Sequence, residues 1–210
     1  MDLSTSELQT LAQQLRKPEG AYGQEVGKKM VEFNTPVIAF TIECLHLQPR
    51  DHVLEIGFGP GEGIAEAAFL APEGYIAGID HSAEMLAMAE ERNHRAIMHE
   101  QVELTLGEAR ALPYDDESFD AVFSVNVLHF WKEPSVELAE CLRVLKPGGR
   151  IAMYLSHPST WLKGFAETGV FVARDAKQTE RILLDTGFQN VESKEFAGTE
   201  AKGFVVMGRK

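Results

Sequence analysis

Cysteine is scarce in this chain of 210 residues: Cys44 and Cys141 are the only two. Neither lies in a CxxC motif or beside a histidine at ligand spacing, so two buried, reduced thiols are more plausible than a zinc or redox site. The sequence His99-Glu100 begins like the HExxH zinc motif, but Glu103 stands where the second histidine is required. We therefore expect no metal site.

Long apolar runs and basic residues are also in short supply. No stretch approaches the roughly 18 apolar residues of a membrane helix, and residues 1–14 lack the basic and apolar regions of a signal peptide. Lys and Arg number 20 against 32 Asp and Glu, which gives a net charge of −12. Because nucleic-acid affinity comes largely from Lys and Arg, we expect a cytoplasmic protein with neither a nucleic-acid nor a membrane partner.

The first 50 residues show helical spacing of apolar side chains. Residues 8–15 and 26–33 predict two helices. A third is expected to begin at Pro36, with Thr35 as its N-cap, and to end before Pro49. No repeat or flexible linker divides the chain, so we expect one main domain, residues 51–210, preceded by a helical segment, residues 1–50.

From residue 51 onward, short apolar runs alternate with helical patterns. Strands are expected over residues 52–56, 75–79, 102–106, 119–125 and 150–155, with helices over 61–70, 82–92 and 134–145. Such alternation implies right-handed crossovers and a parallel sheet. After a helix over 176–186, the gap between strands 190–196 and 204–208 is too short for a crossover, so these two should form an antiparallel hairpin. The sequence predicts an α/β, doubly wound, seven-stranded and mostly parallel sheet with an antiparallel last strand.

A glycine-rich turn follows the first strand. Glycine is needed where the backbone takes positive φ or approaches a ligand closely, and Gly57, Gly59 and Gly61 lie where open α/β sheets bind ligands. Glu62 stands where the dinucleotide fingerprint requires glycine, and no Gly-Lys-Ser/Thr follows. With Glu55 and Glu62 flanking it, the turn suits a cationic or neutral ligand better than an anion. A tight turn that binds nothing is the alternative.

Asp80 ends the second predicted strand. Its carboxylate can accept hydrogen bonds from both hydroxyls of a ribose, as in dinucleotide sites. The alternative is an acid that caps the helix beginning after Ser82.

With these residues and three further motifs, the chain resembles the class I S-adenosylmethionine-dependent methyltransferases, in the subgroup of the ubiquinone and menaquinone methyltransferases. The further motifs are Gly107-Glu108-Ala109, Ser118-Phe119-Asp120 and Leu145-Lys146-Pro147-Gly148-Gly149. The resemblance covers roughly residues 51–155. It implies a Rossmann-like fold and S-adenosylmethionine as the cofactor, with Glu55, Gly57, Gly59 and Gly61 at its methionine and ribose parts, Asp80 at the ribose, and His81, Met85, Glu108 and Ala109 at the adenine.

The resemblance also implies a transfer site after the fourth strand, lined by Asn126 and His129. His129 is a candidate base if its pKa stays near 6.5, and a packed structural histidine is the alternative. The segment after the fourth strand lacks the Asn-Pro-Pro-aromatic signature of enzymes that methylate nucleic-acid bases. We expect Tyr22, in a loop before a helix, to lie near the methionine carboxylate.

The family implies that residues 1–50, as a lid, and an insert over 156–175 select the acceptor. A small-molecule acceptor is favoured, and its identity and the atom that is methylated stay open. Two other functions stay open as well: a non-catalytic S-adenosylmethionine-binding module and, with less support, a nicotinamide-dependent oxidoreductase. The chain is compatible with a monomer or a homodimer.

Overall fold

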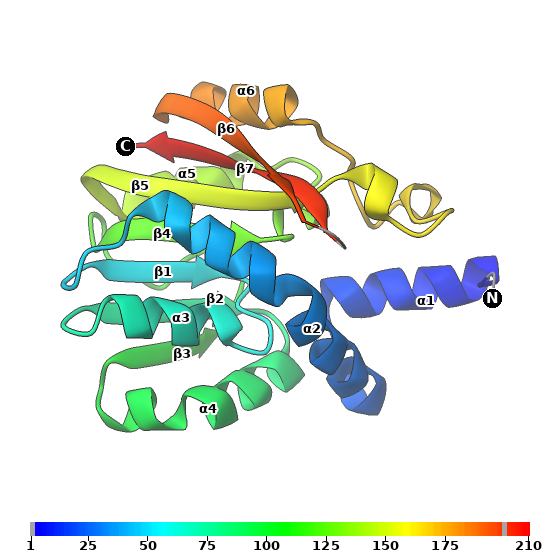
Figure 1. Cartoon of the computed structure of the whole chain (residues 1–210), viewed down its shortest axis with the longest axis horizontal. Coiled ribbons are helices and arrows are strands. Elements are labelled where there is room, and N and C mark those ends of the chain that lie inside the picture. Colours follow the sequence, from blue (N-terminus) through cyan, green and yellow to red (C-terminus); the bar gives the residue numbers. More distant parts are fainter. Residues whose placement is uncertain (1–2, 199–200) are drawn as a thin grey trace.

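A seven-stranded sheet forms the centre of the protein, whose computed structural model describes residues 3–198 and 201–210. The strand order is β3-β2-β1-β4-β5-β7-β6, and among the described strands β7 runs opposite to the other six (Figure 1). The predicted fold class is therefore confirmed. The strands are β1 (His52–Ile56), β2 (Tyr75–Asp80), β3 (Val102–Leu106), β4 (Phe119–Val125), β5 (Leu145–Ser156), β6 (Gln189–Ala197) and β7 (Lys202–Arg209).

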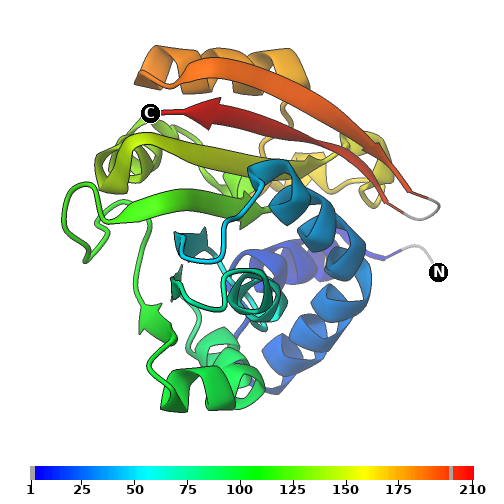
Figure 2. The same ribbon diagram turned by 60° about the vertical axis from the view of Figure 1, so that its left-hand side comes forward.

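Helices cover both faces of this sheet (Figure 2). One face carries α2 (Gly20–Leu45), α3 (Glu62–Leu70) and α4 (Ala83–Met98), and the other carries α5 (Ser135–Val144) and α6 (Ala176–Thr186). Each face has its own apolar core, because strands buried on both sides present side chains to two layers of helices. Among the described residues, no helix is long and apolar enough to cross a membrane.

The strand order reverses direction between β1 and β4. Chain connections from these neighbours leave to opposite sides, and open α/β sheets bind ligands at the carboxyl ends of such strands. Helix α1 (Thr5–Arg16) lies at this end, toward which the arrows of β1 and β4 point in Figure 1. The segment between β5 and α6 lies there too, with the short helices η2 (Pro158–Thr160) and η3 (Ala166–Thr168), and a third short helix, η1 (Leu128–Phe130), follows β4.

The prediction of a helix break before Pro36 was wrong. Helix α2 runs without interruption from Gly20 to Leu45, with Pro36 inside it. Thr35, the predicted N-cap, instead donates a hydrogen bond from its hydroxyl to the Val31 carbonyl at 2.6 Å. The burial of apolar side chains beyond the proline, including Val37 and Ile42, stabilises one long helix against the sheet. Tertiary packing therefore overrides the local preference of proline.

Two other boundaries differ from the prediction. Helix α4 continues past residue 92 to Met98, because Asn93 is buried and its amide donates a hydrogen bond to the Gly61 carbonyl at 3.1 Å. Strand β5 begins at Leu145 rather than at residue 150, with a register shift against β4. The residues Pro147-Gly148-Gly149 thus lie at the irregular start of a strand instead of separating a helix from it.

The continuity of α2 predicts the effect of Pro36→Ala. Pro36 is exposed and lacks the N–H that would bond to a carbonyl one turn earlier, so alanine should raise the free energy of unfolding by about 1–2 kcal/mol in urea titrations. Pro158→Ala is the matched control, because Pro158 stands at the first turn of η2, where proline is tolerated. A lower free energy of unfolding in Pro36→Ala than in the wild type would contradict the description of α2 as one helix. That result is expected if Pro36 stands in the first turn of a separate helix.

Candidate functional site

The glycine loop after β1 has three residues in the left-handed region. Gly57, Gly59 and Gly61 have φ of 69°, 52° and 87°. A Cβ on Gly57 would lie 2.5 Å from Cγ2 of Val127, and a Cβ on Gly61 would lie 2.8 Å from Cβ of Ala89. These two glycines let the loop pack against the end of β4 and against α4. Gly59, which is half-buried, instead has no neighbouring atom within 4 Å of such a Cβ among the described residues, so this side of its backbone is open to a ligand.

Asp80 ties this loop to the end of β2. Its Oδ2 accepts a hydrogen bond from the Gly59 N–H and its Oδ1 one from the Ser82 N–H, both at 2.9 Å. The side chain is almost completely buried. Burial raises the pKa of Asp80, and the bonds from Ser82 and Gly59 oppose this rise. Since each carboxylate oxygen accepts more than one hydrogen bond, Asp80 retains capacity for further donors.

Two glutamates surround the same loop. Glu55 is 2% exposed, and its Oε2 has no hydrogen-bond partner among the described residues. Burial raises the pKa of Glu55 well above its ordinary value, and the charges of Glu62 and Asp80 raise it further. Glu62 forms an ion pair with Arg92. Three carboxyl groups against one arginine give the loop a surplus of acidic groups, which favours a cationic ligand and opposes a pyrophosphate.

A cavity of about 360 Å³ lies at the carboxyl ends of β2 and β3. This volume is in the range of small-molecule sites. Part of its lining comes from the strand ends: His81 follows β2, and Leu106-Gly107-Glu108 lie at the end of β3. The rest comes from α1 and the linker that follows it, namely Gln13, Gln14, Arg16, Lys17 and Glu19. Glu108 is exposed, while Ala109 is half-buried against the core below α5.

The linker between α1 and α2 is fixed to the segment that follows β2. His81 Nε2 donates a hydrogen bond to the Arg16 carbonyl at 2.6 Å, and the Ser82 hydroxyl donates one to the Pro18 carbonyl at 2.5 Å. The Gly20 N–H donates to Glu84 Oε1 at 2.6 Å. The linker therefore closes over the region next to Asp80 through backbone groups, for which a sequence carries little signal.

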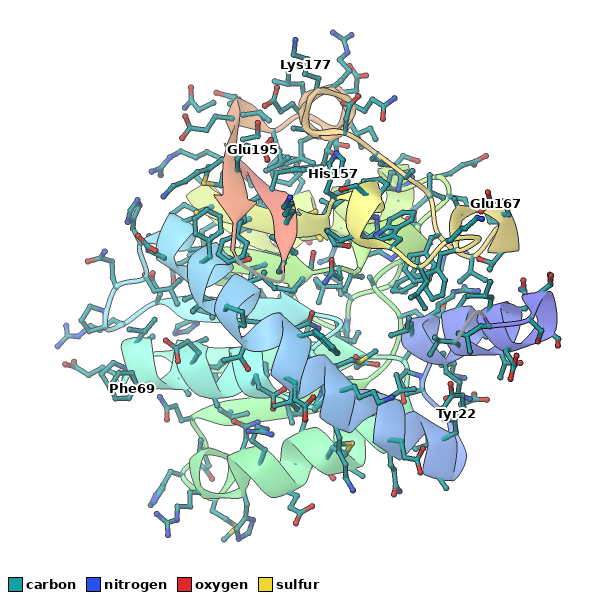
Figure 3. The ribbon with its side chains drawn as sticks, turned by 45° about the vertical axis from the view of Figure 1, so that its right-hand side comes forward. Tyr22, Phe69, His157, Glu167, Lys177 and Glu195 are labelled. Atoms are coloured by element: carbon teal, nitrogen blue, oxygen red, sulfur yellow. The ribbon has the colours of Figure 1, made fainter. Side chains whose placement is uncertain are left out.

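Tyr22 lies within α2, so its predicted place in a loop before a helix was wrong, and it lies apart from these contacts. Its side chain is 42% exposed and forms no hydrogen bond with any described residue. Figure 3 shows it at the end of α2 that lies beside α1, near the edge of the molecule. Its contact with a methionine carboxylate stays a prediction.

Met85 is buried under α2. A Cβ on Gly27 would lie 2.7 Å from Cε of Met85, so the small residue admits this side chain. The predicted site residues Gly57, Gly59, Gly61, Asp80, His81 and Met85 thus lie on adjoining segments at the carboxyl ends of β1 and β2.

Asn126 follows β4 in a strained backbone conformation, with φ of 60°. Its Oδ1 accepts a hydrogen bond from the Ser156 N–H at 3.0 Å, and its Nδ2 donates to Oδ1 of Asn34 at 3.3 Å. The sequence analysis missed Asn34. The sequence gives one indication of its role: asparagine has a low helix propensity, so its presence inside a helix suggests that its side chain has a partner.

His129 lies in η1 and is completely buried. Its Nδ1 lies 3.3 Å from the Val172 carbonyl and its Nε2 3.3 Å from the Ser156 hydroxyl, which in turn accepts a hydrogen bond from Trp161 Nε1 at 3.0 Å. A single neutral tautomer satisfies all of these bonds: Nδ1 donates and Nε2 accepts. The Trp161 ring packs edge-on against the imidazole at 4.9 Å between centroids.

The surroundings of His129 keep it neutral. Burial lowers its pKa to about 4, and the charge of the buried Arg174 contributes. Arg174, also missed by the sequence analysis, donates hydrogen bonds to the carbonyls of Leu128 and Trp131 and so holds η1 against the insert. Of the two interpretations of His129, the geometry favours the packed residue.

Among the described residues, no group of three His, Cys, Asp or Glu could hold a metal ion.

Comparison with known families matches residues 54–153 to a family model described as a methyltransferase domain. A demethylmenaquinone methyltransferase of Symbiobacterium thermophilum is 35% identical over 129 residues, which are 60% of this chain and 50% of that protein. The 27-O-demethylrifamycin SV methyltransferase of Amycolatopsis mediterranei is 34% identical over 109 residues, 52% of this chain and 40% of that protein. The chain thus spans half or less of the length of these relatives.

Solved structures show the same fold. A putative methyltransferase in complex with the Haloferax volcanii Trm112 activator has a TM-score of 0.78 at 18% identity, covering 89% of this chain and 93% of that one. A methyltransferase described as SAM-dependent from Aquifex aeolicus has a TM-score of 0.70 at 21% identity, covering 99% of both chains. At these identities the likeness establishes the Rossmann-like methyltransferase fold alone.

The buried, neutral state of His129 predicts a pH dependence of stability. Because the unfolded chain binds a proton near pH 6.5 and the folded protein only near pH 4, the folded state loses stability as pH falls through this window. The loss is on the order of 3 kcal/mol. Urea titrations at pH 7.5 and 4.5 should show a smaller loss in His129→Gln than in the wild type, whereas His157→Gln, at an exposed histidine, should behave as the wild type does. If all three proteins lost the same free energy of unfolding between pH 7.5 and 4.5, the buried, neutral state of His129 would be contradicted.

Proposed function

We propose that this chain, whose residues 54–153 match a family model described as a methyltransferase domain, is an S-adenosylmethionine-dependent methyltransferase acting on a small-molecule acceptor. The observation that carries the proposal is the acidic glycine loop. It combines an open backbone at Gly59 with the buried carboxyl groups of Glu55 and Asp80. A cofactor with a sulfonium and an ammonium group fits such surroundings.

The residues around the loop fit the parts of this cofactor. The open backbone at Gly59 and the orphaned Oε2 of Glu55 suit its methionine part, and the free acceptor capacity of Asp80 suits the ribose hydroxyls. The neighbouring cavity suits the adenine. In this proposal the cofactor-binding residues are Tyr22, Glu55, Gly57, Gly59, Gly61, Asp80, His81, Met85, Glu108, Ala109 and Asn126.

Catalysis in this proposal depends on alignment and the exclusion of water. When bound, S-adenosylmethionine supplies a methyl group on a positively charged sulfur, which leaves as a neutral thioether as an acceptor lone pair bonds to the methyl carbon. Asn126 lines the position of transfer, next to the glycine loop that Val127 contacts. His129 orients the insert instead of taking a proton, because both ring nitrogens already have partners.

The insert and α1 form the wall on the acceptor side. Phe165 and Val170 pack with Ala12 of α1 in a separate apolar cluster, to which Trp161 and Phe171 add aromatic surface. This cluster supports a roof that keeps water from the transfer site. The named relatives act on a menaquinone precursor and on a rifamycin, which supports a small organic acceptor for this chain. A cytoplasmic location and a monomeric or homodimeric state stay predictions.

A nicotinamide-dependent oxidoreductase is disfavoured by the same loop. Dinucleotide sites hold a pyrophosphate against a turn whose fingerprint requires glycine, and here Glu62 stands at one of those glycine positions.

Calorimetric titration tests the proposed cofactor. The wild type should bind S-adenosylhomocysteine in the micromolar range and should not bind NADH. Asp80→Asn keeps one oxygen acceptor but loses the charge, and should weaken S-adenosylhomocysteine binding about tenfold or more. Asp185→Asn, at an exposed aspartate on α6, is the matched control and should bind as the wild type does. Binding of NADH, or equal affinity of the wild type and Asp80→Asn, would overturn the assignment.

A further inference from the structure

One face of α2 runs along the whole candidate site. Gly23, Gly27 and Asn34 are four and seven residues apart, a spacing that brings them to the same side of a helix. Gly23 packs on Pro18 of the linker: a Cβ on it would lie 2.7 Å from the Pro18 carbonyl carbon. Gly27 packs on Met85, as described above. Figure 1 shows α2 crossing the sheet obliquely toward α1.

Asn34 is the next residue of this face and contacts the end of β4. Its Oδ1 accepts the hydrogen bond from Asn126. Asn126 lies beside the glycine loop, because its neighbour Val127 would touch a Cβ on Gly57. Asn34 therefore extends the contacts of α2 from the linker and Met85 to the position where Asn126 meets the loop.

The Asn34 side chain keeps most of its hydrogen-bonding capacity. Within the described part of the chain, the bond from Asn126 is the only one its amide makes. One lone pair of Oδ1 and both N–H groups stay available. The residue is half-buried.

Stability does not explain an asparagine here. In a helix interior it is less favourable than alanine, and the single long bond to Asn126 adds little. Gly23 and Gly27 are poor helix formers as well, and each is accounted for by a close contact with the linker or with Met85. The weak helix formers on this face thus coincide with the contacts that α2 makes at the site.

We propose that Asn34 is a positioning residue at the site of methyl transfer: together with Asn126 it presents uncharged amide oxygens to the group that occupies the position of the departing methyl. This inference rests on the proposed function. An amide oxygen attracts a polarised C–H group, as on a methyl next to a sulfonium, and it accepts a hydrogen bond from an ammonium group more strongly.

Two analogues of S-adenosylmethionine test the proposed role of Asn34. Their binding can be measured even though the methyl acceptor is not known. S-adenosylhomocysteine has nothing at the position of the methyl, whereas sinefungin carries an amine there. In calorimetric titrations, Asn34→Ala should weaken sinefungin about fivefold or more and leave S-adenosylhomocysteine within about twofold of the wild type. Asn34→Asp adds a negative charge next to the amine, so it should strengthen sinefungin binding relative to S-adenosylhomocysteine. Thr35→Ala, at an exposed neighbour on the same helix, should leave the ratio unchanged.

The other outcomes of these titrations separate a failure of this inference from a failure of the proposed function. Equal weakening of both ligands by Asn34→Ala would overturn the inference, because it would reduce Asn34 to a general contact of α2. Unchanged affinities in Asn34→Ala, or an unchanged ratio in Asn34→Asp, would overturn it as well. If the wild type bound neither analogue, the proposed function itself would fail, and the inference with it.

Discussion

The carboxylate of Asp80 joins the parts of the structure that have to meet at the site. One oxygen holds the glycine loop after β1 and the other holds the first turn of α4. Ser82, fixed in this way, holds the Pro18 carbonyl of the linker, and the linker carries α1 to its place beside the insert. Two strand ends, the start of a helix and the N-terminal helical segment are thus connected through one buried acidic residue. Its location at the end of β2 follows from the parallel sheet, which brings the carboxyl ends of neighbouring strands to one edge.

Burying acidic groups is unfavourable unless partners compensate them. Asp80 is compensated by two backbone N–H groups and Glu62 by Arg92, whereas Oε2 of Glu55 has no hydrogen-bond partner among the described residues. A cationic ligand would supply the missing partner. The region around η1 differs, because His129, Ser156 and Trp161 are linked by hydrogen bonds and none of these three side chains is charged.

The sequence predicted the sheet well because its strands are short apolar runs bounded by clear turns, and the short gap before Phe204 is compatible only with a hairpin. It also located Asp80 and the glycine loop, since their chemistry depends on residues next to a strand end. It failed at Pro36, where burial of the flanking helix outweighs local preference, and at Asn34 and Arg174, whose partners are 92 and 46 residues away in the chain. Such partners are fixed by tertiary structure, and no local pattern encodes them.

The most direct test of this account is a crystal structure of the protein with S-adenosylhomocysteine. The account predicts the ribose hydroxyls on Asp80, the adenine in the cavity between His81 and Glu108, and the sulfur facing the pair formed by Asn34 and Asn126. A ligand bound elsewhere, or one whose ribose leaves Asp80 without a new contact, would contradict it.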